Sequence, residues 1–130
     1  MISNQTDIGG VFQNFQYAYT FKDTLIYRQV LDKNFTFTYR DYVKEVDVSW
    51  GREEEMAYTY GLFQNSQRLD LIWNNILLMS GDSTHVVRSF NLTVTFNPTD
   101  INYVDGRVNL TLIKVNNKWK ILSWIDESNF

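Results

Sequence analysis

Residues 84–125 alternate between apolar and polar positions in a way that predicts three successive strands. Period-two alternation is typical of a strand with one dry face and one wetter face. The predicted apolar side consists of Val86, Arg88, Phe90, Leu92, Val94 and Phe96, then Val104, Val108, Leu110 and Leu112, then Trp119, Ile121 and Ile125. The upstream chain must therefore cover the apolar face of this sheet.

Two helices are predicted upstream of these strands. Apolar spacings of three and four indicate a helix over residues 8–21, with Asp7 as its N-cap and Thr6 as the alternative. A second, shorter helix is capped at position 23 or 24 and is broken by residues 32–34. Its predicted inner face consists of Leu25, Val30 and Leu31, with Tyr27 at the edge.

A third helix is predicted after residues 49–51, where three consecutive glutamates occupy positions 53–55. Acidic side chains suit the positive end of a helix dipole. We interpret these glutamates as a solvated helix start rather than as a carboxylate pair for acid–base chemistry. The residues predicted to point inward from this helix are Met56, Tyr60 and Phe63.

The remaining segments read as strands and turns. Residues 35–39 alternate as a strand, with a possible hairpin return through Val46 and Val48. A further strand runs from position 69 to 79 and contains a predicted bulge at Asn74–Asn75. Turns are expected at residues 81–82, 97–100 and 116–117, the last being a two-residue hairpin signal because asparagine tolerates positive φ.

Length, cysteine content and net charge exclude several kinds of site and partner but do not identify a function. The 130 residues, with no cysteine, predict one domain spanning residues 1–130 and exclude disulfides and zinc–thiolate sites. A net charge of −3 and the lack of a basic run argue against a nucleic-acid partner. No apolar stretch reaches the length of a membrane span, and the first residues lack a signal region. The compartment stays open: cytoplasmic, or an exported domain without its leader.

The order of elements resembles the nuclear transport factor 2-like superfamily (SnoaL-like, cystatin-like roll). The segments that carry the resemblance are residues 15–19 before Asp23, residues 27–35, the Trp-Gly-Arg-Glu-Glu-Glu run at 50–55, and Trp119-Lys120-Ile121. The resemblance implies an α+β roll in which three helices pack in the concave face of a curved, mainly antiparallel sheet. It also implies a pocket between helices and sheet, often a homodimer, and activities that range from isomerase to scaffold.

The catalytic residues of known branches do not carry over to this chain. A steroid-isomerase-like branch would have a tyrosine and an aspartate where Phe15 and Tyr39 stand. A dehydratase-like branch uses histidine, and the only histidine is His85. We expect His85 not to be essential to any chemistry of this protein. One histidine and scattered acids do not predict a metal site, and we expect no cofactor.

The large members of the helix stripes and the sheet face predict an aromatic pocket. The chain contains four Trp, eight Tyr and nine Phe, which fits either a well-filled core or a ring-lined cavity. Arg88 shares a strand side with Phe90 and could bind a ligand carboxylate, or pair with an acid, or reach to water. The predicted ligand-binding residues are Phe15, Tyr19, Tyr39, Trp50, Met56, Tyr60, Trp73, Arg88 and Phe90.

Three functions remain open at this point. The first is a homodimeric protein that binds a small apolar or aromatic ligand; the second is an isomerase-, dehydratase- or hydrolase-like enzyme; the third is a protein-interaction module. The predicted dimer uses the outward sheet face, whose residues are short, neutral and β-branched. This face is expected to carry Thr93, Thr95, Asn109, Thr111, Leu122 and Trp124, with Val87 and Ile113 at its edges.

Overall fold

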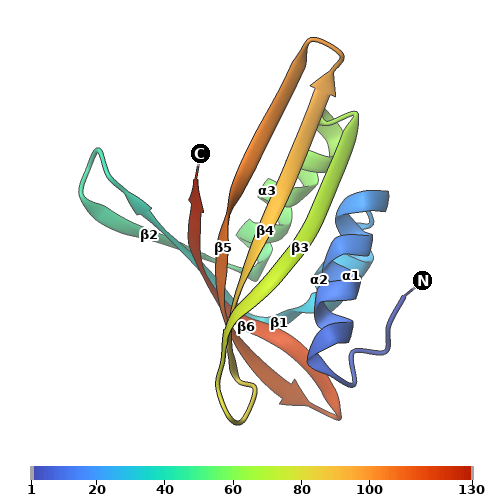
Figure 1. The fold of residues 1–130 in the computed structure, drawn as a ribbon, viewed down its shortest axis with the longest axis vertical. Helices are drawn as coiled ribbons and strands as arrows, with labels where there is room; N and C mark the ends of the chain where they lie inside the picture. Colours follow the sequence, from blue (N-terminus) through green and yellow to red (C-terminus); the bar gives the residue numbers. More distant parts are fainter. Residues whose placement is uncertain (1, 130) are drawn as a thin grey trace.

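The computed structural model describes residues 2–129, with the side chains of residues 128 and 129 outside the description. The elements, in chain order, are α1 (Ile8–Phe21), α2 (Thr24–Val30), β1 (Leu31–Asp41), β2 (Val46–Gly51), α3 (Arg52–Asn65), β3 (Arg68–Met79), β4 (His85–Asn97), β5 (Asp100–Val115) and β6 (Lys118–Asn129) (Figure 1). The strands form one six-stranded sheet in the order β2-β1-β6-β5-β4-β3. Neighbouring strands are antiparallel except β1 and β6, which run parallel. None of the described helices is long and apolar enough to cross a membrane.

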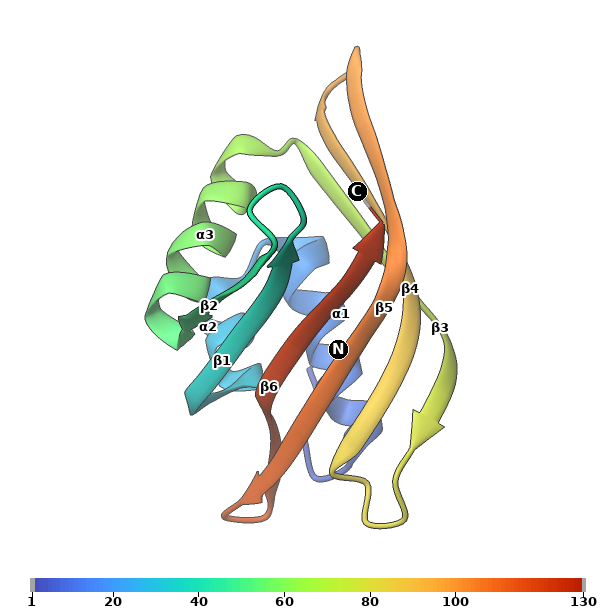
Figure 2. The ribbon, with the colours of Figure 1, turned by 90° about the vertical axis from the view of Figure 1, so that its left-hand side faces the viewer.

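All three helices lie on one side of the curved sheet (Figure 2). The buried core lies between them and the sheet, and it contains Phe12 and Phe15 of α1, Val86 and Phe90 of β4, and Leu110 of β5, among others. This α+β roll confirms the predicted fold class. The long, alternating strands of the C-terminal half form the floor of the roll, and the N-terminal helices close it.

Side-chain caps begin both of the first two helices. Asp7 Oδ1 accepts a hydrogen bond from the Gly10 backbone N–H at 2.7 Å, and Asp23 Oδ1 accepts one from Ile26 at 3.1 Å. The predicted inner face of α2 is wrong at one position, because Leu25 is 73% exposed while Ile26 and Tyr27 are buried. Because the helix is only seven residues long, its few apolar positions do not fix the orientation of its inner face to within one residue.

The inner face of α3 differs from the prediction. Its buried residues are Glu55, Thr59 and Phe63, whereas Tyr60 is 54% exposed and Met56 is partly buried. The interpretation of all three glutamates as a solvated helix start is therefore wrong for Glu55. Apolar periodicity cannot detect a helix face whose inner residues are polar and hydrogen-bonded.

Two predicted irregularities of the sheet are confirmed. The β3–β4 register shifts between Trp73 and Ile76, where the Asn74–Asn75 bulge was expected. Asn116 and Asn117 both have positive φ, 52° and 64°, as the two-residue hairpin between β5 and β6 requires.

A further irregularity was not predicted and reverses the direction of one tryptophan. The β5–β6 register shifts between Thr111 and Leu112, so Ile121 and Trp124 both pair with inward-facing positions of β5. An extra residue in one strand moves every later side chain to the other face. The prediction that Trp124 lies on the outward face is therefore wrong, and Ile125 lies there instead.

Candidate functional site

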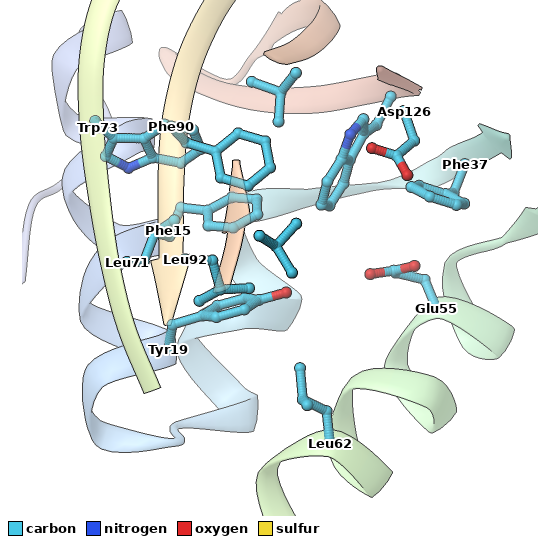
Figure 3. A pocket seen from close by; sticks show the side chains of 13 residues that line it. Phe15, Tyr19, Phe37, Glu55, Leu62, Leu71, Trp73, Phe90, Leu92 and Asp126 are labelled. Carbon is cyan, nitrogen blue, oxygen red and sulfur yellow. The ribbon is translucent and has the colours of Figure 1, made fainter. Parts of the chain in front are cut away.

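A cavity of about 220 Å³ lies between the helices and the concave face of the sheet (Figure 3). Six of its lining side chains are aromatic or indole rings and two are carboxylates. Its lining residues are Phe15, Tyr19, Phe37, Glu55, Leu62, Leu71, Trp73, Phe90, Leu92, Val104, Val108, Trp124 and Asp126. The cavity is therefore formed by α1, α3 and five of the six strands.

Phe15 is the ring around which the apolar part of the cavity is arranged. It is only 2% exposed and stacks on Tyr19 at a centroid distance of 5.3 Å. Its ring also meets Trp73 edge-on at 5.3 Å and Trp124 at 5.6 Å. Such edge and offset contacts are the favoured geometries of aromatic pairs and hold each ring in place. The apolar wall is consequently a closely packed group of rings.

Glu55 is the polar centre of the cavity. Three donors surround its carboxylate and compensate for its burial. Tyr27 Oη donates to Oε2 at 2.6 Å, Thr59 Oγ1 donates to Oε2 at 3.1 Å, and Trp50 Nε1 donates to Oε1 at 2.8 Å. The residue is 5% exposed. Burial raises the pKa of the Glu55 carboxyl, the three donors lower it, and the charge of Asp126 raises it further. Glu55 is thus a proton-binding group with a pKa above its ordinary value.

A second carboxylate and a tyrosine complete the polar wall. Asp126 of β6 and Glu55 of α3 lie on the same side of the cavity, across from Trp73 and Phe90 (Figure 3). Burial raises the pKa of Tyr19, and the charge of Glu55 adds to that rise. Tyr19 therefore stays protonated at neutral pH, and its hydroxyl end points toward the Glu55 side of the cavity (Figure 3).

One buried donor at the cavity lacks a partner. Within residues 2–129, the Nε1 of Trp124 is shielded from solvent and makes no hydrogen bond. Leaving a buried donor unpaired is unfavourable by about 1–3 kcal/mol.

The structure brings four of the nine predicted site residues into the lining: Phe15, Tyr19, Trp73 and Phe90. Trp50 and Tyr39 lie behind the lining, where Trp50 stacks on Phe37 at 4.9 Å. Met56 packs against the core, and Tyr60 faces solvent. Contact of the four lining residues with a ligand stays a prediction.

Arg88 lies at the end of the aromatic wall rather than in the lining. Its guanidinium carbon is 4.7 Å from the centroid of Phe12 and 5.8 Å from that of Trp73, and its Nε donates to the Asn74 carbonyl at 2.9 Å. These contacts hold the guanidinium over rings and backbone. Burial lowers the pKa of Arg88 from its usual value.

His85 lies away from the cavity, at the start of β4. Its Nε2 is 2.7 Å from Asn109 Oδ1 of the neighbouring strand, and it does not belong to the lining. Within the described residues, no group of three or more His, Asp or Glu side chains could hold a metal ion.

The sequence analysis did not predict the two acidic residues of the lining, Glu55 and Asp126. No apolar periodicity marks Glu55. The signal is instead the set of donors that surround it, which are Trp50 and Thr59, close to it in sequence, and Tyr27 of α2. Asp126 is two residues beyond Trp124 and therefore shares its strand face. The register of β6 on β5 is therefore what places Asp126 in the lining.

Comparison with known proteins establishes the fold. No family model matches the sequence, and no curated protein matches it. The structure is similar to a candidate scytalone dehydratase from Novosphingobium aromaticivorans, with a TM-score of 0.80, 13% identity, and coverage of 95% of this chain and 82% of that one. It is also similar to a protein of unknown function from Shewanella baltica that is described as NTF2-like, with a TM-score of 0.67, 15% identity, and coverage of 95% and 91%.

A third similar structure is a candidate aromatic ring hydroxylase, also from Novosphingobium aromaticivorans. Its TM-score is 0.74 at 12% identity, with coverage of 100% of this chain and 90% of that one. The chain therefore has the nuclear transport factor 2-like (SnoaL-like) fold that the sequence resembled. Identities this low describe the fold and leave the activity to be argued from the site.

Proposed function

We propose that the cavity binds a small, largely apolar molecule that contains an aromatic ring. The observation that carries this proposal is the cavity of about 220 Å³, whose lining includes six aromatic side chains. A dry cavity of about 150 Å³ suffices for benzene, so one ring with a short substituent matches the space. A few convergent polar groups in an otherwise apolar pocket are the usual design of ligand sites.

Phe15, Tyr19, Trp73 and Phe90 are the residues we propose to contact the ring of the ligand.

Ligand-observed NMR with a small panel tests this proposal. The panel consists of single-ring molecules that are neutral, cationic and anionic: 2-phenylethanol, 2-phenylethylamine and phenylacetate. We expect at least one to bind, and we expect Leu62→Trp, which extends a side chain into the cavity from α3, to abolish that binding (Figure 3). Leu25→Trp is the control, because Leu25 is exposed on α2.

Two results would contradict the proposal. One is that no member of the panel binds the wild-type protein. The other is that binding survives in Leu62→Trp as well as in the control, which would place the ligand outside the cavity.

An enzyme of the isomerase or dehydratase type is the second candidate. The observation that favours it is Glu55, a cavity carboxyl with a raised pKa beside a second carboxylate, which suits proton transfer. A similar structure, the candidate scytalone dehydratase, points in the same direction. If the protein has isomerase or dehydratase activity, loss of that activity in both Glu55→Gln and Asp126→Asn would support proton transfer by this pair. Activity that persists in both variants would exclude it.

We also propose a homodimer through the outward face of the sheet. Three exposed apolar residues support it: Ile72, Tyr103 and Ile125 pair with the outward-facing Asn91, Thr93 and Asn109. A durable dimer should bury about 1,200–2,000 Å². Sedimentation at micromolar concentration should show a dimer that Ile125→Glu dissociates and that Val43→Glu, in the β1–β2 turn, does not. A wild-type monomer would contradict it.

A further inference from the structure

The lining of the cavity contains two acidic side chains. They are Glu55 and Asp126, and the described part of the chain contributes no Lys, Arg or His to the lining. The charge of Asp126 contributes to the raised pKa of Glu55. Any molecule that enters the cavity therefore meets two carboxyl groups and no basic side chain of the described residues.

Hydrogen bonds favour the ionised form of Glu55, against the effect of burial. Trp50 Nε1 can only donate, and the hydroxyls of Tyr27 and Thr59 donate to the other oxygen, so both carboxylate oxygens act as acceptors. Among the described ion pairs, Arg28 and Arg52 both bind the neighbouring Glu53, at 2.7 and 3.5 Å, and none includes Glu55. Glu55 is thus a buried acidic group with hydrogen bonds but no cation.

The rings that line the cavity also suit positive charge. The faces of aromatic rings carry negative potential and attract ammonium groups, most strongly when the site is desolvated. Six rings line the cavity, and Phe15, Trp73 and Trp124 are fixed relative to one another by edge contacts. Rings and carboxylates together form the kind of surface that recognises an organic cation.

We propose that the ligand of this cavity is a small organic cation, a protonated amine joined by a short chain to one aromatic ring. The ring lies against Phe15 and Trp73, and the ammonium group donates to the carboxylates of Glu55 and Asp126. This inference rests on the proposed function and narrows it to one ligand class. An alkyl ammonium is protonated near neutral pH, as lysine is, and its bonds to carboxylates are charge-assisted.

Isothermal titration calorimetry near neutral pH tests the sign of the ligand charge. The probes are 2-phenylethylamine, its neutral counterpart 2-phenylethanol, and the anion phenylacetate. We expect the amine to bind at least about tenfold more tightly than the alcohol, and phenylacetate to bind most weakly. Equal affinity for amine and alcohol, or a preference for phenylacetate, would overturn the inference.

Charge-neutralising variants locate the effect. Glu55→Gln and Asp126→Asn should each lower the affinity for 2-phenylethylamine about tenfold and leave the affinity for 2-phenylethanol within about twofold. Glu54→Gln on α3 and Asp105→Asn on β5 remove the same charge from exposed positions and should leave both affinities unchanged. An equal drop in the exposed variants would mean that the net charge of the protein, and not the cavity, attracts the amine. The wild-type ligand series decides the matter even if a pocket variant fails to fold.

The pattern of failure separates this inference from the proposed function. If amine and alcohol bind equally and Leu62→Trp abolishes both, the cavity binds ligands but does not select cations. If none of the three probes binds, the proposed function fails and the inference fails with it.

Discussion

The two walls of the cavity are built on different physical principles. The wall formed by Phe15, Trp73 and Phe90 consists of rings that contact one another, and its one polar atom, Trp73 Nε1, donates to the Phe12 carbonyl at 2.9 Å. The wall formed by Glu55 and Asp126 consists of acidic groups, and Glu55 is tolerated inside only because three donors surround it. The first wall therefore supplies stability and shape, whereas the second buries acidic groups at some expense of stability and, in our proposal, selects the ligand.

The largest expected effect concerns the aromatic wall. Phe15→Ala should lower the free energy of unfolding by about 3–5 kcal/mol, because it removes a nearly fully buried ring that contacts four other rings. Urea denaturation measures the change. Phe21→Ala, on the same helix but 65% exposed, should change stability by less than about 0.5 kcal/mol. Similar small losses of unfolding free energy in both variants would show that the packing of this wall does not depend on Phe15.

A smaller loss is expected when a donor of the polar wall is removed. Tyr27→Phe should cost about 1–3 kcal/mol at neutral pH, because Glu55 Oε2 then keeps only the donor from Thr59. The same urea titration applies, with Tyr58→Phe as the matched control, since Tyr58 is exposed on α3. A Tyr27→Phe protein as stable as the wild type would mean that Glu55 does not depend on this hydrogen bond.

The pH dependence of stability should separate the two walls further. The pKa of Glu55 is raised above the 4.5 of an unperturbed glutamate, so above about pH 4.5 the native state binds the proton that the unfolded state has released. Its contribution to the free energy of unfolding therefore falls as pH rises from about 4.5 through the folded pKa. The groups facing Glu55 are Tyr19 of α1, Tyr27 of α2 and Asp126 of β6, and the pKa values of both tyrosines are raised by burial, so they stay neutral.

The comparison variant is Glu55→Gln, which cannot ionise. Its stability relative to the wild type should increase as pH rises from about 4.5 toward neutral, measured as the difference between urea midpoints at successive pH values. A difference that is constant with pH, or that shrinks as pH rises, would contradict the raised pKa.

The smallest expected effect lies at the end of the aromatic wall. A double-mutant cycle of Arg88→Gln and Phe12→Leu should give a coupling free energy of about 0.5–1 kcal/mol, the usual size of a partly exposed cation–π contact. Additive losses would show that the guanidinium gains nothing from the ring beneath it.

The fold was predictable because its pattern is local and strongly periodic. Residues 84–125 alternate over long strands, and helix caps at Asp7 and Asp23 satisfy backbone donors within three residues. The same periodicity brought Phe15, Trp73 and Phe90 to one cavity, since large apolar residues on facing elements must meet. The aromatic wall was therefore largely accessible from the sequence.

The polar wall was not accessible in the same way. Burial of Glu55 depends on donors from Tyr27 of α2, Trp50 of β2 and Thr59 of α3, and such side-chain hydrogen bonds leave no periodic apolar signal. Asp126 and Trp124 enter the cavity because the β5–β6 register shifts near Thr111, and a one-residue shift reverses every later side chain. Both failures concern features that only the assembled fold can specify.

The most direct test of the account is a crystal structure of the protein with 2-phenylethylamine bound. We expect the ring of the amine to lie against Phe15 and Trp73. We expect its ammonium nitrogen to lie at hydrogen-bond distance, about 3 Å, from carboxylate oxygens of both Glu55 and Asp126. Density for the amine on the protein surface, or within the cavity with its nitrogen directed away from both carboxylates, would contradict it.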